Sequence, residues 1–203
     1  MPSVCFYFQV HQPLRVKRYR IFDVGQDPHY FNDESASNLN NRRLINKVSE
    51  KCYLPANRLL QDLLARHPEF KVPFSLSGVL LDQLEEFAPE VLRSFRDLVK
   101  TGRVELLAET YYHSLAYLHS RDEFRRQVRL QRRKILDLFN YEPTVFRHTE
   151  LIYNNDLAQE AEALGFGGIL AEGADQLLGW RSPNFVYRPK GTKFIKLLLK
   201  NYR

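Results

Sequence analysis

The sequence contains only two cysteines, and this scarcity limits the ways in which the fold can be held together. Cys5 and Cys52 lie far apart and lack the paired spacing of metal ligands. Neither a disulfide framework nor a zinc framework is therefore predicted. Cys5 falls in an apolar stretch, where we expect it to pack as a small hydrophobic residue.

Long apolar runs are also missing from the sequence. No stretch approaches the length of a membrane span, and the N-terminus has no basic segment followed by a long apolar one. A secretory signal and a membrane contact are therefore not predicted, and we expect a cytoplasmic protein. With 44% hydrophobic and 27% charged residues, the composition is typical of a globular domain.

Positive charge is in excess, with a net charge of +6 over the 203 residues. Nucleic-acid-binding proteins can have such a balance. The basic residues gather at 15–20, at 125–134 and in the final stretch, and the middle run falls on a predicted amphipathic helix. Such a run is more typical of a solvent-exposed helix face, so a nucleic-acid partner is not expected.

Apolar, β-prone segments alternate along the chain with segments of helical apolar spacing. Strands are predicted at residues 3–10, 71–77, 103–108, 144–149 and 166–171, with one or two more near residue 186 and at 194–199. Helices are predicted at 41–66 with a break or kink near Pro55, at 79–100 divided by Pro89, at 120–139 behind a capping box, and at 155–164. A long polar loop is predicted between the first strand and residue 40. This order favours one α/β domain with a parallel sheet or barrel.

Polar residues follow the predicted strands, and in parallel α/β folds that edge of the sheet forms the active site. They are His11 and Gln12, then Glu109 and His113, then Arg147, His148 and Glu150, and finally Glu172 and Asp175. Glu150 stands out, because an apolar strand delivers it directly before a helix. In a regular strand His148 would share a face with Glu150 and Arg147 would not, so His148 is predicted to lie beside Glu150.

Each of these residues also has a structural interpretation. Arg147 and Glu150 could form a buried ion pair, and Glu172 and Asp175 are more typical of helix starts. Trp180 could pack in a core or line a sugar subsite.

Two other site chemistries receive less support from the sequence. Zinc ligation by His11, His113, Glu109 and Glu150 is possible in principle, but no His-x-x-x-His spacing is present. A Ser–His–Asp hydrolase is less favoured still, because no Gly-x-Ser-x-Gly turn occurs.

Four segments, in order, resemble the signatures of glycoside hydrolase family 57, the group of α-amylases, 4-α-glucanotransferases and related glucan enzymes. The segments are VCFYFQVHQP at 4–13, GRVELLAETYYHS at 102–114, FRHTELIY at 146–153, and GILAEGAD at 168–175 leading into GWRSPN at 179–184. The resemblance runs over essentially the whole chain.

This resemblance implies a TIM-like, incomplete (β/α)7 barrel and a retaining hydrolase or transglycosylase acting on α-1,4-glucans. Glu150 would be the nucleophile and would form a covalent glycosyl-enzyme. Neither a metal nor another cofactor is expected. The predicted substrate-binding residues are His11, Gln12, Glu109, His113, Arg147, His148 and Trp180.

The chain departs from the family pattern at two points. Family members of this type usually have Asn at the position of His148, and the motif that carries the acid/base Asp is not found. We therefore expect residues 1–203 to be the N-terminal portion of a catalytic barrel, truncated on its C-terminal side and close to inactive alone. The alternatives are a non-catalytic glucan-binding protein and, less favoured, a metal-dependent sugar hydrolase or deacetylase. The choice between hydrolysis and transglycosylation, the linkage and the oligomeric state stay open.

Overall fold

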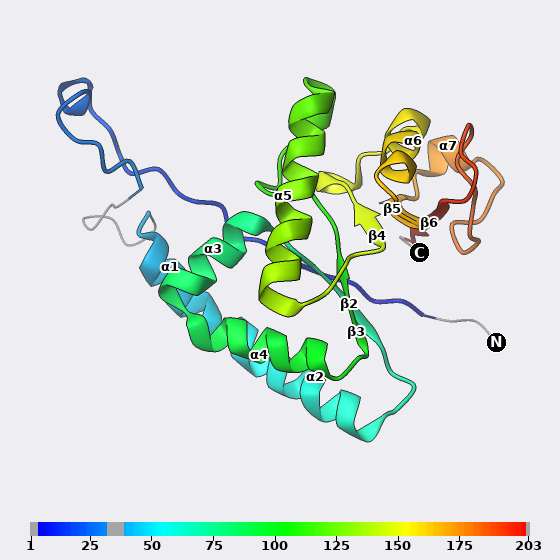
Figure 1. Cartoon of the computed structure of the whole chain (residues 1–203), viewed down its shortest axis with the longest axis horizontal. Coiled ribbons are helices and arrows are strands. Elements are labelled where there is room, and N and C mark those ends of the chain that lie inside the picture. The colour runs from blue at the N-terminus through cyan, green and yellow to red at the C-terminus, as the bar shows by residue number, and fades with distance from the viewer. Residues whose placement is uncertain (1–3, 32–38, 202–203) are drawn as a thin grey trace. The chain divides into compact units, whose positions relative to one another are not determined.

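The computed structural model describes residues 4–31 and 39–201, which form two compact units. The first unit comprises Met1–Gln9, Pro73–Gly78 and Glu105–Arg203, and the second comprises Val10–Val72 and Val79–Val104. Figure 1 labels the helices and strands of both units. Within the described residues, no helix is both long enough and apolar enough to cross a bilayer.

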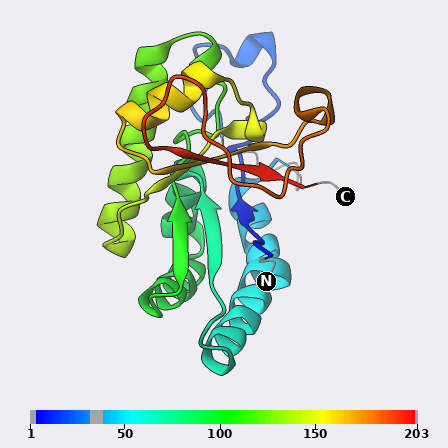
Figure 2. The same ribbon diagram turned by 90° about the vertical axis from the view of Figure 1, so that its right-hand side faces the viewer.

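The strands follow one another in sequence order in two three-stranded sheets. One sheet contains β1 (Phe8–Val10), β2 (Val72–Leu76) and β3 (Val104–Leu107), and the other contains β4 (Val145–Arg147), β5 (Gly168–Glu172) and β6 (Lys196–Lys200). A parallel bridge between Ala108 and Phe146 links β3 to β4. β5 pairs in parallel with both β4 and β6, and the arrows of β2 and β3 in Figure 2 point the same way. The predicted α/β architecture with parallel strands is thus confirmed.

An aromatic cluster forms the core of the first unit. Phe146 on β4 packs against Phe124 of α5 (Arg121–Phe139) at 5.7 Å and against Phe166 at 5.4 Å between ring centroids. All three rings are fully buried, and each contributes roughly 2–3 kcal/mol of hydrophobic stabilisation. The core thereby fixes β4, the strand that leads to Glu150, against the helix layer.

The predicted capping box at the start of α5 forms only in part. The Ser120 hydroxyl accepts from the backbone N–H of Glu123, as expected. The Glu123 carboxylate, however, binds the side chains of Arg126 and Gln127, and these bonds lower its pKa to about 2. Arg125 likewise pairs with Glu160 of α6 (Asn155–Ala163). None of the basic residues at 125–134 is buried, and Arg126, Arg129 and Arg133 are exposed, which agrees with the predicted solvent-exposed helix face.

The two predicted proline sites differ in outcome: Pro89 separates two helices as predicted, whereas the backbone stays helical through Pro55 and is not broken there. Pro55 lies in the first turn of α2 (Leu54–Arg66), which joins α1 (Asn41–Val48) through a π-helical turn at Ser49–Tyr53. Pro89 starts α4 (Pro89–Lys100) directly after α3 (Gly78–Phe87).

Short helical segments complete the order of elements. They are the 3-10 turns Ile21–Asp23, Ala116–Leu118 and Thr149–Leu151, and α7 (Asp175–Leu178). Asp175 thus starts a helix, as its structural interpretation predicted.

The N-terminal segment differs from its prediction. The strand predicted at 3–10 is only three residues long, and Ser3 lies outside the described residues. Cys5 is exposed, so its predicted packing is wrong; it precedes β1, which is an edge strand of its sheet. Residues 32–38 of the predicted loop also lie outside the described part of the chain.

Gly173 lies where the ends of β5 and β6 approach each other. A Cβ atom there would be 2.2 Å from the Lys200 carbonyl oxygen, whereas one on Gly167 would be 4.0 Å from its nearest neighbour, the Thr144 carbonyl oxygen. We therefore expect Gly173→Ala to lower the free energy of unfolding by about 1–3 kcal/mol through this clash. Gly167→Ala, its control, should change it by less than about 0.5 kcal/mol. Urea unfolding followed by circular dichroism measures both, and equal effects would contradict the prediction.

Candidate active site

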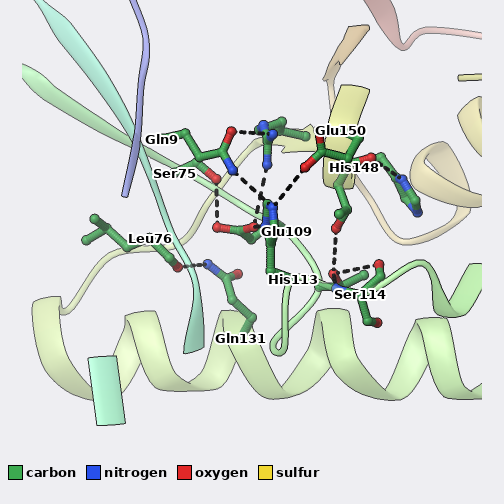
Figure 3. A network of polar contacts seen from close by, with 12 residues as sticks. Gln9, Ser75, Leu76, Glu109, His113, Ser114, Gln131, His148 and Glu150 are labelled. Carbon is green, nitrogen blue, oxygen red and sulfur yellow. Dashed lines mark hydrogen bonds and ion pairs between the residues drawn. The ribbon is translucent and has the colours of Figure 1, made fainter. Parts of the chain in front are cut away.

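Glu109 is the centre of a buried polar network in the first unit (Figure 3). It follows Ala108, the residue that bridges to β4, and its side chain is fully buried. The Ser75 hydroxyl on β2 donates to Oε1 at 2.8 Å, and His113 Nδ1 lies 2.8 Å from Oε2. The strand end and the following turn thus hold a carboxylate and an imidazole together.

Arg147, the last residue of β4, joins this network from the neighbouring strand. Its side chain is buried, with Nη1 3.6 Å from Glu109 Oε2. Nη2 donates to Gln9 Oε1 at 2.6 Å, and Gln9 Nε2 lies 3.0 Å from His113 Nε2. Glu109, His113, Gln9 and Arg147 therefore form a closed ring of polar contacts.

Glu150 lies at the rim of this ring, in the 3-10 turn Thr149–Leu151. Its backbone is left-handed, with φ 56° and ψ 20°, and Leu151 follows at φ 55°. The side chain is 72% exposed, and its Oε1 is 3.6 Å from His113 Nε2. Left-handed conformations are costly for residues with a Cβ and occur often at functional sites. The fold thus holds the exposed Glu150 carboxylate next to the mostly buried His113 side chain, and this position requires a strained backbone.

Hydrogen bonds around the turn hold this conformation in place. The Thr149 and Thr110 hydroxyls lie 3.1 Å apart, and the Leu151 N–H donates to the His148 carbonyl at 3.0 Å. The Thr110 hydroxyl also accepts from the Ser114 N–H at 2.9 Å, which ties the His113 turn to the Glu150 turn.

The predicted placement of His148 beside Glu150 is wrong. The regular strand ends at Arg147, so strict alternation fails where the turn begins. Arg147 points into the polar ring, while the fully buried His148 ring lies among aromatics, 5.8 Å from Tyr117 and 5.9 Å from Phe124 between centroids. Its Nδ1 is 3.0 Å from the Thr149 carbonyl oxygen, and Figure 3 shows it directed away from the Glu150 carboxylate. His148 thus supports the turn from its core side.

Burial lowers the pKa of His148, and the charge of Arg147 lowers it further, against the opposing effect of the Thr149 carbonyl. In the unfolded chain this imidazole takes up a proton below about pH 6.5, which the folded chain resists. The free energy of unfolding should therefore fall as the pH drops from about 7 to about 5. In His148→Asn, which cannot titrate, that fall should be smaller. Urea unfolding at a series of pH values tests this, and parallel pH profiles for both proteins would contradict it.

His11, Gln12 and Trp180 are the other predicted substrate-binding residues. His11 and Gln12 belong to the second unit, in which Gln12 Oε1 accepts from Arg15 at 3.0 Å and the Gln12 carbonyl accepts from Gln83 at 2.7 Å. Trp180 follows α7 in the first unit, with 91% of its surface exposed and the Arg181 guanidinium 5.7 Å from its ring. Its position excludes the core-packing alternative, and its role as a sugar subsite stays a prediction.

Sequence reasoning missed Gln9 and Ser75 as members of the network. Both are polar residues inside apolar strand segments, FYFQV and VPFSL. A polar residue inside an apolar strand segment indicates a hydrogen-bond partner, so this interruption was the available signal; the structure buries Ser75 and leaves Gln9 exposed. Among the described residues, no group of three or more His, Cys, Asp or Glu side chains is arranged to hold a metal ion.

Comparison with known proteins now identifies the family. Residues 5–203 match glycosyl hydrolase family 57 over nearly the full chain. The chain belongs to this family. A putative α-amylase of Methanocaldococcus jannaschii is 43% identical over 202 residues, which cover 98% of this chain and 42% of that protein. The chain therefore spans less than half the length of this relative.

Solved structures of family members share the fold. A 4-α-glucanotransferase from Thermococcus litoralis matches 98% of this chain and 27% of its own chain, with a TM-score of 0.72 and 19% identity. A family 57 branching enzyme from Thermococcus kodakaraensis matches 97% of this chain and 47% of its own, with a TM-score of 0.71 and 13% identity. At these identities the likeness concerns the fold alone.

Proposed function

We propose that this chain carries the nucleophile side of a retaining α-glucan active site, with Glu150 as the nucleophile. The observation that carries the proposal is the Glu150 turn itself. A carboxylate exposed on a strained turn, 3.6 Å from an imidazole that pairs with the buried Glu109, is held ready to meet a substrate. Family membership supplies the substrate class, an α-linked glucan.

In the proposed reaction a Glu150 oxygen attacks the anomeric carbon from the face opposite the glycosidic oxygen. A carbon–oxygen ester bond forms, and the glycosidic bond breaks with its electron pair passing to the leaving oxygen, which takes a proton from an acid. Water or a sugar hydroxyl then attacks the same carbon, loses its proton to the conjugate base, and releases the Glu150 carboxylate. Hydrolysis and transglycosylation share this intermediate.

The buried residues have a supporting role in this proposal. Glu109 is fully buried, so it acts through His113. The His113 side chain is 8% exposed, and its outer edge is the part of the ring network that faces Glu150. Trp180, with its open indole face, is proposed to stack on a glucose unit, since sugar rings present apolar C–H faces. His11 and Gln12, in the second unit, are also proposed as substrate-binding residues.

The acid/base is not assigned to any of the 203 residues. We therefore propose that the chain alone cleaves ordinary α-glucans very slowly, because the leaving oxygen receives no proton. A substrate whose leaving group needs no acid should bypass this requirement.

The test uses an α-glucosyl fluoride that carries a second fluorine on C5, the non-anomeric carbon bonded to the ring oxygen. This compound is called the fluoride probe below. Fluoride leaves without protonation, and the second fluorine slows release of the sugar from the enzyme. Intact-mass and peptide mass spectrometry should show one glucosyl adduct on the peptide that contains Glu150. An adduct on another carboxylate would overturn the assignment. A chain that binds maltodextrin in calorimetry but forms no adduct would support the non-catalytic glucan-binding alternative.

A further inference from the structure

The polar ring contains one residue whose hydrogen bonding is fixed by chemistry alone. Arg147 has only donors, so the Gln9 atom 2.6 Å from its Nη2 must be the amide oxygen. The other end of the same amide, its NH2 group, then faces His113 Nε2 at 3.0 Å. The buried arginine therefore dictates the orientation of the Gln9 amide.

This orientation decides which nitrogen of His113 carries a proton. An amide NH2 group only donates, so His113 Nε2 must accept and carries a lone pair. In a neutral ring the proton then resides on Nδ1, which donates to Glu109 Oε2 at 2.8 Å. The Ser75 hydroxyl donates to the second oxygen of the same carboxylate at 2.8 Å. Donors and acceptors thus match along the whole chain from Arg147 to Ser75.

We propose that Gln9 is a positioning residue that locks His113 in the Nδ1–H tautomer and thereby keeps the nucleophile free. In this tautomer the lone pair of Nε2 and the oxygen of Glu150, 3.6 Å apart, are both acceptors and form no hydrogen bond. In the opposite tautomer Nε2–H would donate to Glu150 and occupy the electron pair needed for attack. The effect of this tautomer on the Glu150 nucleophile rests on the proposed function, whereas the assignment of the His113 tautomer does not.

Long-range ¹H–¹⁵N correlation spectra of the ¹⁵N-His-labelled chain give the tautomer directly. The spectra are recorded near pH 8, above the ordinary His pKa of about 6.5. His113→Gln identifies the His113 signals among the six histidines. We expect a protonated Nδ1 and an unprotonated Nε2, and a protonated Nε2 in the unmodified chain would overturn the proposal. This result needs no variant at Gln9, so misfolding of a variant cannot leave the question open.

The Gln9→Glu variant tests whether Gln9 determines the tautomer of His113. The new carboxylate accepts from both Arg147 and His113, so Nε2 should become protonated while Nδ1 keeps its proton for Glu109. The signals of the other histidines serve as the folding control. Unchanged His113 signals in a folded Gln9→Glu chain would overturn the proposal. Gln9→Leu removes the donor without adding an acceptor and should give a mixture of the two tautomers.

The fluoride probe separates this inference from the proposed function. If Glu150 is labelled, Gln9→Glu should slow labelling by about 10- to 100-fold, because the doubly protonated His113, 3.6 Å from Glu150 Oε1, stabilises the carboxylate by its positive charge and makes it a weaker nucleophile. An unchanged labelling rate would overturn the role of Gln9 at the nucleophile. If the unmodified chain is never labelled but shows the Nδ1–H tautomer, the proposed function fails and the tautomer lock stands.

Discussion

Replacing Glu150 by Gln is expected to abolish adduct formation with the fluoride probe, with a rate loss on the order of 10⁴-fold or more. The amide keeps the size and the exposed position of the side chain but offers no anionic oxygen for attack on the anomeric carbon. Mass spectrometry of the probe-treated variant measures the loss. Glu172→Gln is the matched control, since Glu172 is the last residue of β5, which pairs with β4, and should leave labelling unchanged. Equal labelling of the Glu150→Gln variant would remove Glu150 from the reaction.

Glu150→Gly provides a second and independent signature of the same site. Without a side chain, a small anion such as azide can occupy the vacated position and attack an α-glucosyl fluoride from that face. The C–F bond breaks, fluoride leaves with the electron pair, and the product is the β-glucosyl azide. Formation of the α-azide, or no azide-dependent turnover, would contradict a nucleophile on that face.

The same substitution should make the chain more stable. Glycine adopts φ 56° without the steric cost that a Cβ brings, so the free energy of unfolding should rise by about 1 kcal/mol. A gain in stability with a loss of chemistry is expected where strain serves function. Asn140 is also left-handed, with φ 50°, at the end of α5, and Asn140→Gly is the control for the backbone effect alone.

The sequence predicted the order of elements well, because that order depends on local signals. Pro89 cannot be accommodated inside a helix, and it separates α3 from α4 as expected. Glu109 and Glu150 were predicted at strand ends for the same reason: apolar runs stop there. Such features are determined by residues that are adjacent in the sequence.

The direction of side chains around Glu150 could not be predicted in this way. β4 ends three residues before Glu150, and the left-handed turn changes the direction in which each following side chain points. The link between Gln9 and Arg147 joins residues 138 positions apart, and it depends on how the strands stack side by side. Alternation within one strand carries no information on either point, which is why Arg147 rather than His148 points into the polar ring.

Arg147→Met is expected to destabilise the chain by about 3–5 kcal/mol, the usual cost of removing one partner from a buried ion pair. Methionine retains much of the length of the side chain, so the loss is mainly electrostatic. Glu109 would stay fully buried without the nearby guanidinium, and Gln9 would lose the donor that orients it. Urea unfolding followed by circular dichroism measures the change. Arg125→Met removes a partly exposed ion pair to Glu160 and should cost far less.

A double variant tests whether the ion pair between Arg147 and Glu109 serves only stability or also the labelling of Glu150. Two guanidinium nitrogens of Arg147, Nε and Nη1, are buried with no hydrogen-bond partner among the described residues, so the ion pair is poorly satisfied. Adding Glu109→Gln to Arg147→Met removes the uncompensated charge and should restore about 1–3 kcal/mol of the loss. The double variant should nevertheless label Glu150 more slowly with the fluoride probe, because neither Gln9 nor His113 is then held in place. Recovery of stability together with full labelling would mean that the pair is structural only, and recovery of neither would mean that packing, rather than charge, explains the single variant.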